Sequence, residues 1–167
     1  MYKRQPVIVD ENADLSDVAK KVMRGKTMNA GQICLAPDYL MLPKGKSEEF
    51  AKASNEAISE MFADLKYNED YTSVINERHY ERINELVSDA KEKGAEVIQI
   101  NPADEDFEQQ ELHKIPPTLV LNPTDEMKIM QEEIFGPVLP VKEYDDFDET
   151  VNLSLIHISE PTRPLHI

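Results

Sequence analysis

The amino-acid sequence predicts an α/β fold. Short apolar runs of the kind that form buried strands alternate with longer segments whose apolar residues recur every three or four positions, which is the spacing of one helix face. Glycine and proline separate these segments where turns are needed, and no internal repeat or low-complexity stretch interrupts the alternation. Strands and helices in alternation are typical of α/β domains.

The first strand and helix lead to the loop that holds the single cysteine. Pro6–Asp10 is a short apolar run that predicts a buried strand. Asp14 is placed to cap a helix from Leu15 to about Lys26, because its carboxylate can accept hydrogen bonds from the free N–H groups of the first turn. One stripe of this helix is apolar: Leu15, Val18, Ala19, Val22 and Met23.

Two more helices follow the next strand. Residues 39–42 are expected to form a strand that Pro43 ends. Ser47 is the expected N-cap of a second helix. The inward side of that helix is apolar: Phe50, Ala53, Ala57, Ile58, Met61 and Phe62. A third helix is expected from about Glu77 to Lys93, and Gly94 suits the residue that ends it, since glycine adopts the left-handed conformation of a helix C-terminus without strain.

Three strands and a short helical turn complete the expected fold. The strands are 95–100, 118–121 and 138–144, and the helical turn is 127–131. Residues 101–111 are acidic and are expected to form an exposed loop. A solvated surface is favoured over metal binding by these carboxylates, because no glycine-shaped calcium loop accompanies them.

The composition disfavours several classes of function. A formal charge of −15 at pH 7 disfavours nucleic acid and anionic membrane surfaces as partners, because both need basic side chains. No stretch approaches the roughly 18 apolar residues of a transmembrane helix. One cysteine allows no intramolecular disulfide and suits the reducing cytoplasm. His79 and His113 form no metal-ligand cluster in the sequence, so no metal site is expected.

The stretch from Met28 to Tyr39 is the candidate site, because it holds Cys34. A thiol reacts as a nucleophile through its thiolate, and only where it is accessible. Cys34 lies in a short segment that contains Gly31, and such a turn can expose the side chain and leave backbone N–H groups to face an oxyanion. The alternative is an inert, buried cysteine between Ile33 and Leu35.

Two motifs resemble those of the aldehyde dehydrogenase superfamily. Asn29-Ala30-Gly31-Gln32-Ile33-Cys34 resembles its nucleophile segment. Glu132-Glu133-Ile134-Phe135-Gly136-Pro137 resembles its Glu-Glu-x-Phe-Gly-Pro motif, in the same order and at a similar separation. The run Ala36-Pro37-Asp38-Tyr39 resembles the branch with fatty-aldehyde and coniferyl-aldehyde dehydrogenases. Thr27 departs from the family, which more often has an aromatic or aliphatic residue there.

The resemblance implies a partial aldehyde dehydrogenase catalytic domain with three layers and a mostly parallel sheet. It assigns Cys34 as the catalytic nucleophile, Glu133 as the partner of the nicotinamide ribose hydroxyls, and Phe135 as a residue that packs near the nicotinamide of NAD or NADP. The implied reaction oxidises a small-molecule aldehyde to a carboxylic acid through a cysteine thiohemiacetal and a thioester. The parent protein is expected to be a cytoplasmic homodimer or homotetramer, without a nucleic-acid partner and with no membrane segment evident in this chain.

Two other interpretations remain open. A CoA-acylating relative would pass the acyl group to CoA rather than to water, and a non-catalytic homologue would use this domain as a structural or interaction module. The family's deacylating glutamate begins a Glu-Leu-Gly-Gly-Lys-Ser-type segment whose last five residues correspond to Met1–Gln5. That glutamate, the oxyanion asparagine and the main dinucleotide-binding domain would all lie upstream, so we expect the 167 residues alone to be inactive.

The two ends of the chain resemble translated sequencing adapter. Met1–Gln5 can be encoded by GTG TAT AAG AGA CAG, with GTG as the start codon, and the reverse complement CTG TCT CTT ATA CAC encodes residues 153–157. The next codons, ATC TCC GAG CCC ACG AGA, give residues 158–163 and match a transposase adapter from shotgun libraries. We therefore expect residues 1–5 and 153–167 to be adapter-derived, the latter disordered, and residues 6–152 to be the partial catalytic domain.

Overall fold

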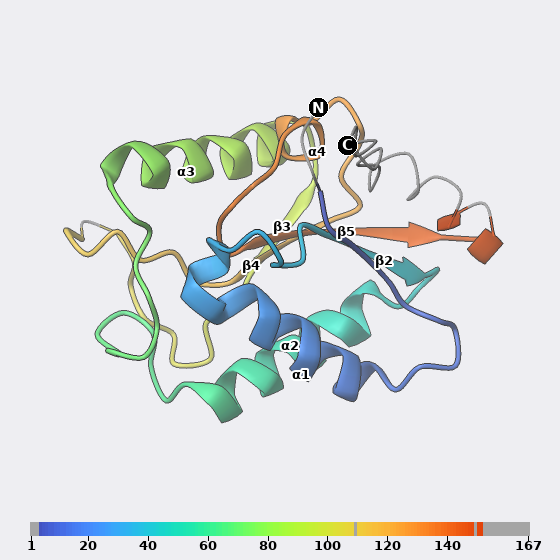
Figure 1. Cartoon of the computed structure of the whole chain (residues 1–167), viewed down its shortest axis with the longest axis horizontal. Coiled ribbons are helices and arrows are strands. Elements are labelled where there is room, and N and C mark those ends of the chain that lie inside the picture. Colours follow the sequence, from blue (N-terminus) through green and yellow to red (C-terminus); the bar gives the residue numbers. More distant parts are fainter. Residues whose placement is uncertain (1–3, 109, 149, 152–167) are drawn as a thin grey trace, which may run out of the picture.

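A five-stranded sheet runs through the part of the molecule that the structure describes (Figure 1). The structure is a computed structural model, and it describes residues 4–108, 110–148 and 150–151. The strand order is β1 (Pro6–Ile8), β2 (Tyr39–Pro43), β5 (Val138–Tyr144), β4 (Thr118–Leu121) and β3 (Glu96–Gln99). Neighbouring strands are parallel except β3, which pairs antiparallel with β4 at one edge.

Helices cover both faces of this sheet. α1 (Leu15–Thr27) and α2 (Ser47–Met61) lie on one face, and α3 (Glu77–Glu92) and the short α4 (Lys128–Gln131) lie on the other (Figure 1). The arrangement confirms the expected α/β fold, with three layers and a mostly parallel sheet. The connections between parallel strands pass through these helices, as parallel pairing requires.

Two of the expected helix ends are confirmed. Asp14 Oδ1 accepts hydrogen bonds from the backbone N–H groups of Ser16 at 2.9 Å and Asp17 at 3.4 Å, so Asp14 is the N-cap of α1. Gly94 follows the last turn of α3 with φ +91°, a backbone conformation that costs glycine little because it has no Cβ.

The expectation that Ser47 caps α2 is wrong. Ser47 is the first residue inside the helix, and Lys46 precedes it without a capping side-chain bond. A carboxylate oxygen of Glu143, on β5, accepts a hydrogen bond from the Ser47 backbone N–H at 3.1 Å. An acceptor from a distant strand therefore satisfies a donor that a local cap would otherwise satisfy.

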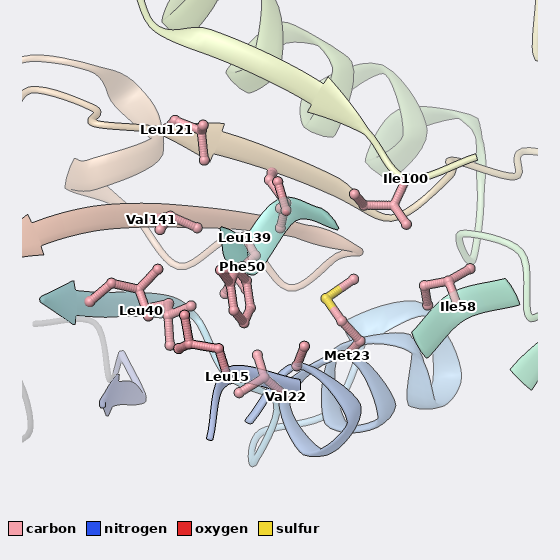
Figure 2. Packing of buried hydrophobic residues seen from close by; sticks show 14 of the residues in the cluster. Leu15, Val22, Met23, Leu40, Phe50, Ile58, Ile100, Leu121, Leu139 and Val141 are labelled. Carbon is pink, nitrogen blue, oxygen red and sulfur yellow. The ribbon is translucent and has the colours of Figure 1, made fainter. Parts of the chain in front are cut away.

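Each face of the sheet packs its own hydrophobic core. In Figure 2, Val22 and Met23 of α1 lie with Phe50 of α2 against β5, which carries Leu139 and Val141. Buried residues of α3, α4 and the opposite sheet face form the second core: Ile83, Leu86, Ala90, Val120, Ile129 and Val138. Alternate strand residues supply the two cores because successive side chains point to opposite faces.

The terminal segments assigned to adapter lie mostly outside the described residues. The structure describes only Arg4 and Gln5 of them. The expected disorder of residues 153–167 concerns residues outside the described part.

Candidate functional site

The segment before Cys34 is a left-handed turn. The 3-10 turn Met28–Gly31 follows α1 directly, and three consecutive residues in it have positive φ: Asn29 at 50°, Ala30 at 51° and Gly31 at 70°. Left-handed backbone is costly for residues with a Cβ and is seldom adopted by several in a row. The chain therefore reverses sharply between the end of α1 and the cysteine.

Gln32 anchors this turn to the loop that precedes α3. Its side-chain oxygen accepts a hydrogen bond from the Ile75 backbone N–H at 2.9 Å, and its side-chain nitrogen donates to the Ser73 carbonyl at 3.1 Å. Asn29 and Gln32 also bond each other, because each side-chain amide donates to the other residue's carbonyl. The Asn-x-Gly-Gln part of the motif thus holds the loop in shape.

Cys34 is exposed, which disagrees with the interpretation as an inert buried cysteine. It lies in a tight turn in which the Ala36 backbone N–H donates to the Ile33 carbonyl at 3.0 Å. Among the described residues, none accepts a hydrogen bond from the Cys34 backbone N–H. An accessible sulfur beside an unused backbone donor suits attack on a carbonyl group.

The cysteine loop and the segment 132–137 touch backbone to backbone. A Cβ placed on Gly31 would lie 2.3 Å from the carbonyl oxygen of Gly136, which is far inside van der Waals contact. A Cβ on Gly136 would lie 2.5 Å from the tip of Ile83, on α3. Glycine at position 31 therefore allows the two motifs to approach each other, and glycine at position 136 allows the second motif to pack against α3.

A hydrogen bond makes a second connection between the same two segments. Asp38 Oδ1 accepts from the Ile134 backbone N–H at 3.0 Å. The two connections fall on either side of Cys34 in one segment, at Gly31 and Asp38, and on either side of Phe135 in the other, at Gly136 and Ile134. The structure thus brings the two predicted site segments together.

The side chains of Glu133 and Phe135 flank the buried Ile134. Phe135 has φ +49° and is 41% exposed, so a large apolar ring faces outward. Glu133 is half-buried, and burial raises its carboxyl pKa, with the nearby charge of Asp38 acting in the same direction. The positive charges of Arg4, Arg82 and Lys26 oppose this rise.

Buried polar side chains lie beneath the cysteine loop. Asp38 is 4% exposed and forms an ion pair with Arg4, whose guanidinium also donates to the Ile129 carbonyl at 3.1 Å and to the Met130 carbonyl. Lys26 is buried and donates to the Pro37 carbonyl at 2.7 Å. These groups join α1, the cysteine loop and α4.

Three of these polar residues have no part in the sequence-based site. Asp38 was visible only within the branch-specific run after the cysteine, while Lys26 and Arg82 stand on helices among other basic residues. A lysine on the apolar side of an amphipathic helix can be recognised as an unusual residue from the sequence, but the sequence does not identify the group that it contacts. Their contacts depend on tertiary structure.

A hollow of about 550 Å³ adjoins the cysteine loop on its α1–α2 side. Met28 and Asn29 form part of its wall, together with Lys20, Lys21 and Arg24 of α1, and Cys34 is not one of its lining residues. Within the described ranges there is no group of three or more His, Cys, Asp or Glu side chains that could hold a metal ion. The same part of the chain contains no helix long and apolar enough to cross a bilayer.

The fold and the two joined loops define an α/β domain in which the loop of an exposed cysteine is connected to a segment that carries a carboxylate and an exposed aromatic ring. The aldehyde dehydrogenase family matches residues 4–154, and the chain belongs to this family. The match includes Arg4, Gln5, Leu153 and Ser154, which lie in the two segments assigned to adapter.

Individual relatives agree with this assignment. The chain is 54% identical over 162 residues to a probable coniferyl aldehyde dehydrogenase of Caulobacter vibrioides, covering 97% of this chain and 33% of the relative. The substrate-bound state of Staphylococcus aureus AldH superposes with a TM-score of 0.79 at 30% identity, over 92% of this chain and 32% of that one. The NADP complex of the NADP-dependent glyceraldehyde-3-phosphate dehydrogenase from Bacillus halodurans gives 0.75 at 26% identity, over 92% and 31%. The chain thus spans about a third of the length of the relatives that it matches.

Proposed function

We propose that the chain is part of an NAD(P)-dependent aldehyde dehydrogenase in which Cys34 is the nucleophile and Glu133 and Phe135 contact the cofactor. The observation that carries the proposal is the double connection, at Gly31–Gly136 and Asp38–Ile134, between the nucleophile loop and the segment 132–137. Such a reaction needs the thiol and the oxidant within one small space, and two rigid connections provide that proximity.

The first step forms a bond between the Cys34 sulfur and the aldehyde carbon. The electron pair of the C=O bond moves to oxygen, which gives a thiohemiacetal alkoxide. The Cys34 backbone N–H would donate to this oxyanion; it has no other acceptor among the described residues.

The residues of segment 132–137 fit a nicotinamide nucleotide. A carboxylate is an acceptor for ribose hydroxyl groups, and the half-buried Glu133 supplies one. The exposed ring of Phe135 offers an apolar face for a planar heterocycle. The chemistry supplied by bound NAD(P)⁺ is acceptance of a hydride from the carbon bonded to Cys34.

Loss of that hydride leaves a Cys34 thioester. Water then attacks the acyl carbon, the C–S bond breaks, and the carboxylic acid leaves while the thiol is restored. The base that would activate this water is expected in the segment before Met1, by resemblance to the family. The main dinucleotide-binding domain and the oxyanion asparagine are expected upstream as well, so we expect the 167-residue chain alone to form no NAD(P)H from aldehydes.

The relatives suggest an aromatic or medium-to-long-chain aldehyde as the substrate. The name of the Caulobacter vibrioides relative specifies coniferyl aldehyde, and the branch resemblance at Ala36–Tyr39 points the same way. The parent enzyme is proposed to be a cytoplasmic homodimer or homotetramer. One cysteine in the whole chain suits that reducing compartment.

The test uses the full-length parent dehydrogenase with coniferyl aldehyde, octanal and either nucleotide. Wild-type enzyme is expected to form NAD(P)H and a free acid, and Cys34→Ser to lose at least about 10³-fold in kcat/KM because an alcohol is a far weaker nucleophile. Acyl-CoA formed only when CoA is added would instead indicate the CoA-acylating relative. An inactive parent that binds no nucleotide would indicate the non-catalytic module.

We also propose that residues 1–5 and 153–167 derive from sequencing adapter. The complementarity of the codons at the two ends supports this. Amplifying the source DNA across both junctions tests it: a Glu-Leu-Gly-Gly-Lys-Ser-like segment before Pro6 is expected. Genomic codons for Met1–Gln5 would overturn it.

A further inference from the structure

Ile134 belongs to two peptide groups, Glu133–Ile134 and Ile134–Phe135, and charged side chains hold both of them. Asp38 Oδ1 accepts its N–H at 3.0 Å. Arg82, on α3, donates from Nη2 to the Ile134 carbonyl and from Nη1 to the Glu133 carbonyl at 3.4 Å. The Glu133–Ile134 peptide group thus has Asp38 at its N–H and Arg82 at its C=O, so turning it breaks both charge-assisted bonds. Arg82 also holds the C=O of the next peptide group, Ile134–Phe135.

Ile134 stands between the two residues assigned to the cofactor. Its own side chain is buried and is assigned no contact with the cofactor. Glu133 shares one of the two held peptide planes and Phe135 shares the other, so fixing both planes restricts the directions in which these two side chains leave the backbone. Phe135 also has a positive φ, which needs support from the surroundings to persist.

We propose that Asp38 and Arg82 are positioning residues that clamp the two peptide groups of Ile134, and so hold the cofactor-contacting segment 132–137 in register with the Cys34 loop. The role in positioning the cofactor rests on the proposed function, whereas the contacts that form the clamp are present in this chain whatever its function. Asp38 belongs to the nucleophile segment, so the clamp links the thiol and the cofactor-contacting residues through one carboxylate.

The bond from Ile134 to Asp38 is buried, and the two bonds from Arg82 are part-buried. Asp38 is almost wholly buried, and its second oxygen is engaged by Arg4, so each oxygen has its own charged or backbone partner. Arg82 is anchored further by Glu132, whose carboxylate lies 3.5 Å from Nη1. The link to Ile134 uses Asp38 Oδ1, whereas Arg4 engages Oδ2.

The first test measures backbone order by ¹⁵N relaxation on the 167-residue chain. In Asp38→Ala and in Arg82→Met, the order parameters of residues 133–136 are expected to fall from about 0.85 to below about 0.6, while those of β4 stay near 0.85. Asp38→Asn keeps an acceptor oxygen for Ile134 and should keep residues 133–136 ordered.

The matched controls are Asp145→Ala and Arg78→Met. Asp145 is an exposed, ion-paired aspartate remote from the loop, and Arg78 is exposed one turn before Arg82 on α3. Unchanged order at 133–136 in Asp38→Ala or Arg82→Met would overturn the proposal. So would a parallel loss of order across β4, which indicates only global stability. If Asp38→Ala does not fold, Arg82→Met decides alone.

The second test uses the full-length parent enzyme and measures the effect on cofactor binding separately from the effect on the reactivity of the thiol. The KM for NAD(P) is expected to rise at least about tenfold in Asp38→Ala and Arg82→Met, whereas cofactor-free alkylation of Cys34 by iodoacetamide changes less than about twofold. A larger change in alkylation than in KM would overturn the role in cofactor positioning. A wild-type parent without activity contradicts the proposed function, while the relaxation result still decides the clamp.

Discussion

Gly31 and Gly136 pass so close that a single methyl group cannot fit between them. A Cβ on Gly31 would lie 2.3 Å from the Gly136 carbonyl oxygen and 2.7 Å from its carbon, and Gly31 itself has φ +70°. Backbone atoms cannot move aside as the end of a flexible side chain can. The glycine of the nucleophile motif is therefore required twice, once for its left-handed conformation and once for the contact.

Gly31→Ala is expected to destabilise the chain by at least about 2 kcal/mol, since left-handed strain and a backbone clash add together. Gly45→Ala is the matched control: Gly45 has φ +77°, but nothing lies within 4 Å of its Cβ position. That variant should lose only about 1 kcal/mol from the conformational strain. Urea unfolding of both variants measures the difference, and equal losses would show that the contact with Gly136 is absent.

The glutamine of the motif supports a second prediction. Gln32→Leu removes the bonds to Ser73 and Ile75 that tie the cysteine loop to the segment before α3, at an expected cost of about 1–2 kcal/mol. Gln99→Leu, on the exposed edge strand β3, should stay within about 0.5 kcal/mol of wild type. Chemical denaturation compares the two, and a neutral Gln32→Leu would mean that water replaces these bonds without loss.

Periodicity and local chemistry were sufficient to predict the order of strands and helices along the chain. The stripe of α1, the cap Asp14 and the terminal Gly94 are all encoded within a few residues of where they act. The two site segments were also visible as motifs, although the role of Gly31 needed the structure, because Gly136 lies far away in the sequence.

What the sequence did not predict depends on contacts between distant segments. Ile134 and Asp38 are 96 positions apart, and no local pattern marks that pair. Glu105 belongs to the acidic loop that was expected to be exposed, yet its carboxylate accepts the backbone N–H groups of Leu65 at 2.6 Å and Lys66 at 2.9 Å. The local sequence does not distinguish a carboxylate that accepts hydrogen bonds from backbone N–H groups from one that is only solvated.

The remote cap of α2 gives a third prediction. Glu143→Ala leaves the Ser47 backbone N–H without its acceptor and should cost about 1–2 kcal/mol, the usual range for a lost cap. Glu48→Ala is the control, because Glu48 is an exposed acidic residue in the same turn and acts only through the helix dipole. Thermal unfolding distinguishes them. Equal shifts in Tm would indicate that the dipole, rather than the hydrogen bond from β5, accounts for the effect of Glu143.

Lys26 gives a prediction for alkaline pH. Burial of the ammonium group lowers its pKa to about 8, against the opposing charge of Asp38, whereas the unfolded chain has the ordinary value near 10.5. Between these two values the unfolded state binds more protons than the folded state, so the free energy of unfolding rises with pH. The contribution of Lys26 is complete above about pH 10.5 and is lost as the pH falls through about 8.

Between about pH 8 and pH 10.5, the free energy of unfolding of the wild type is expected to rise by roughly 3 kcal/mol more than that of Lys26→Met, which has no ammonium group at this position. Lys21→Met is the control, since Lys21 is exposed on the same helix and pairs only with Asp17. Urea unfolding at intervals from pH 7 to 10.5 gives the three curves. Wild type and Lys21→Met should rise together while Lys26→Met lags behind them. Parallel curves for all three variants would mean that water reaches the Lys26 ammonium group beneath the cysteine loop.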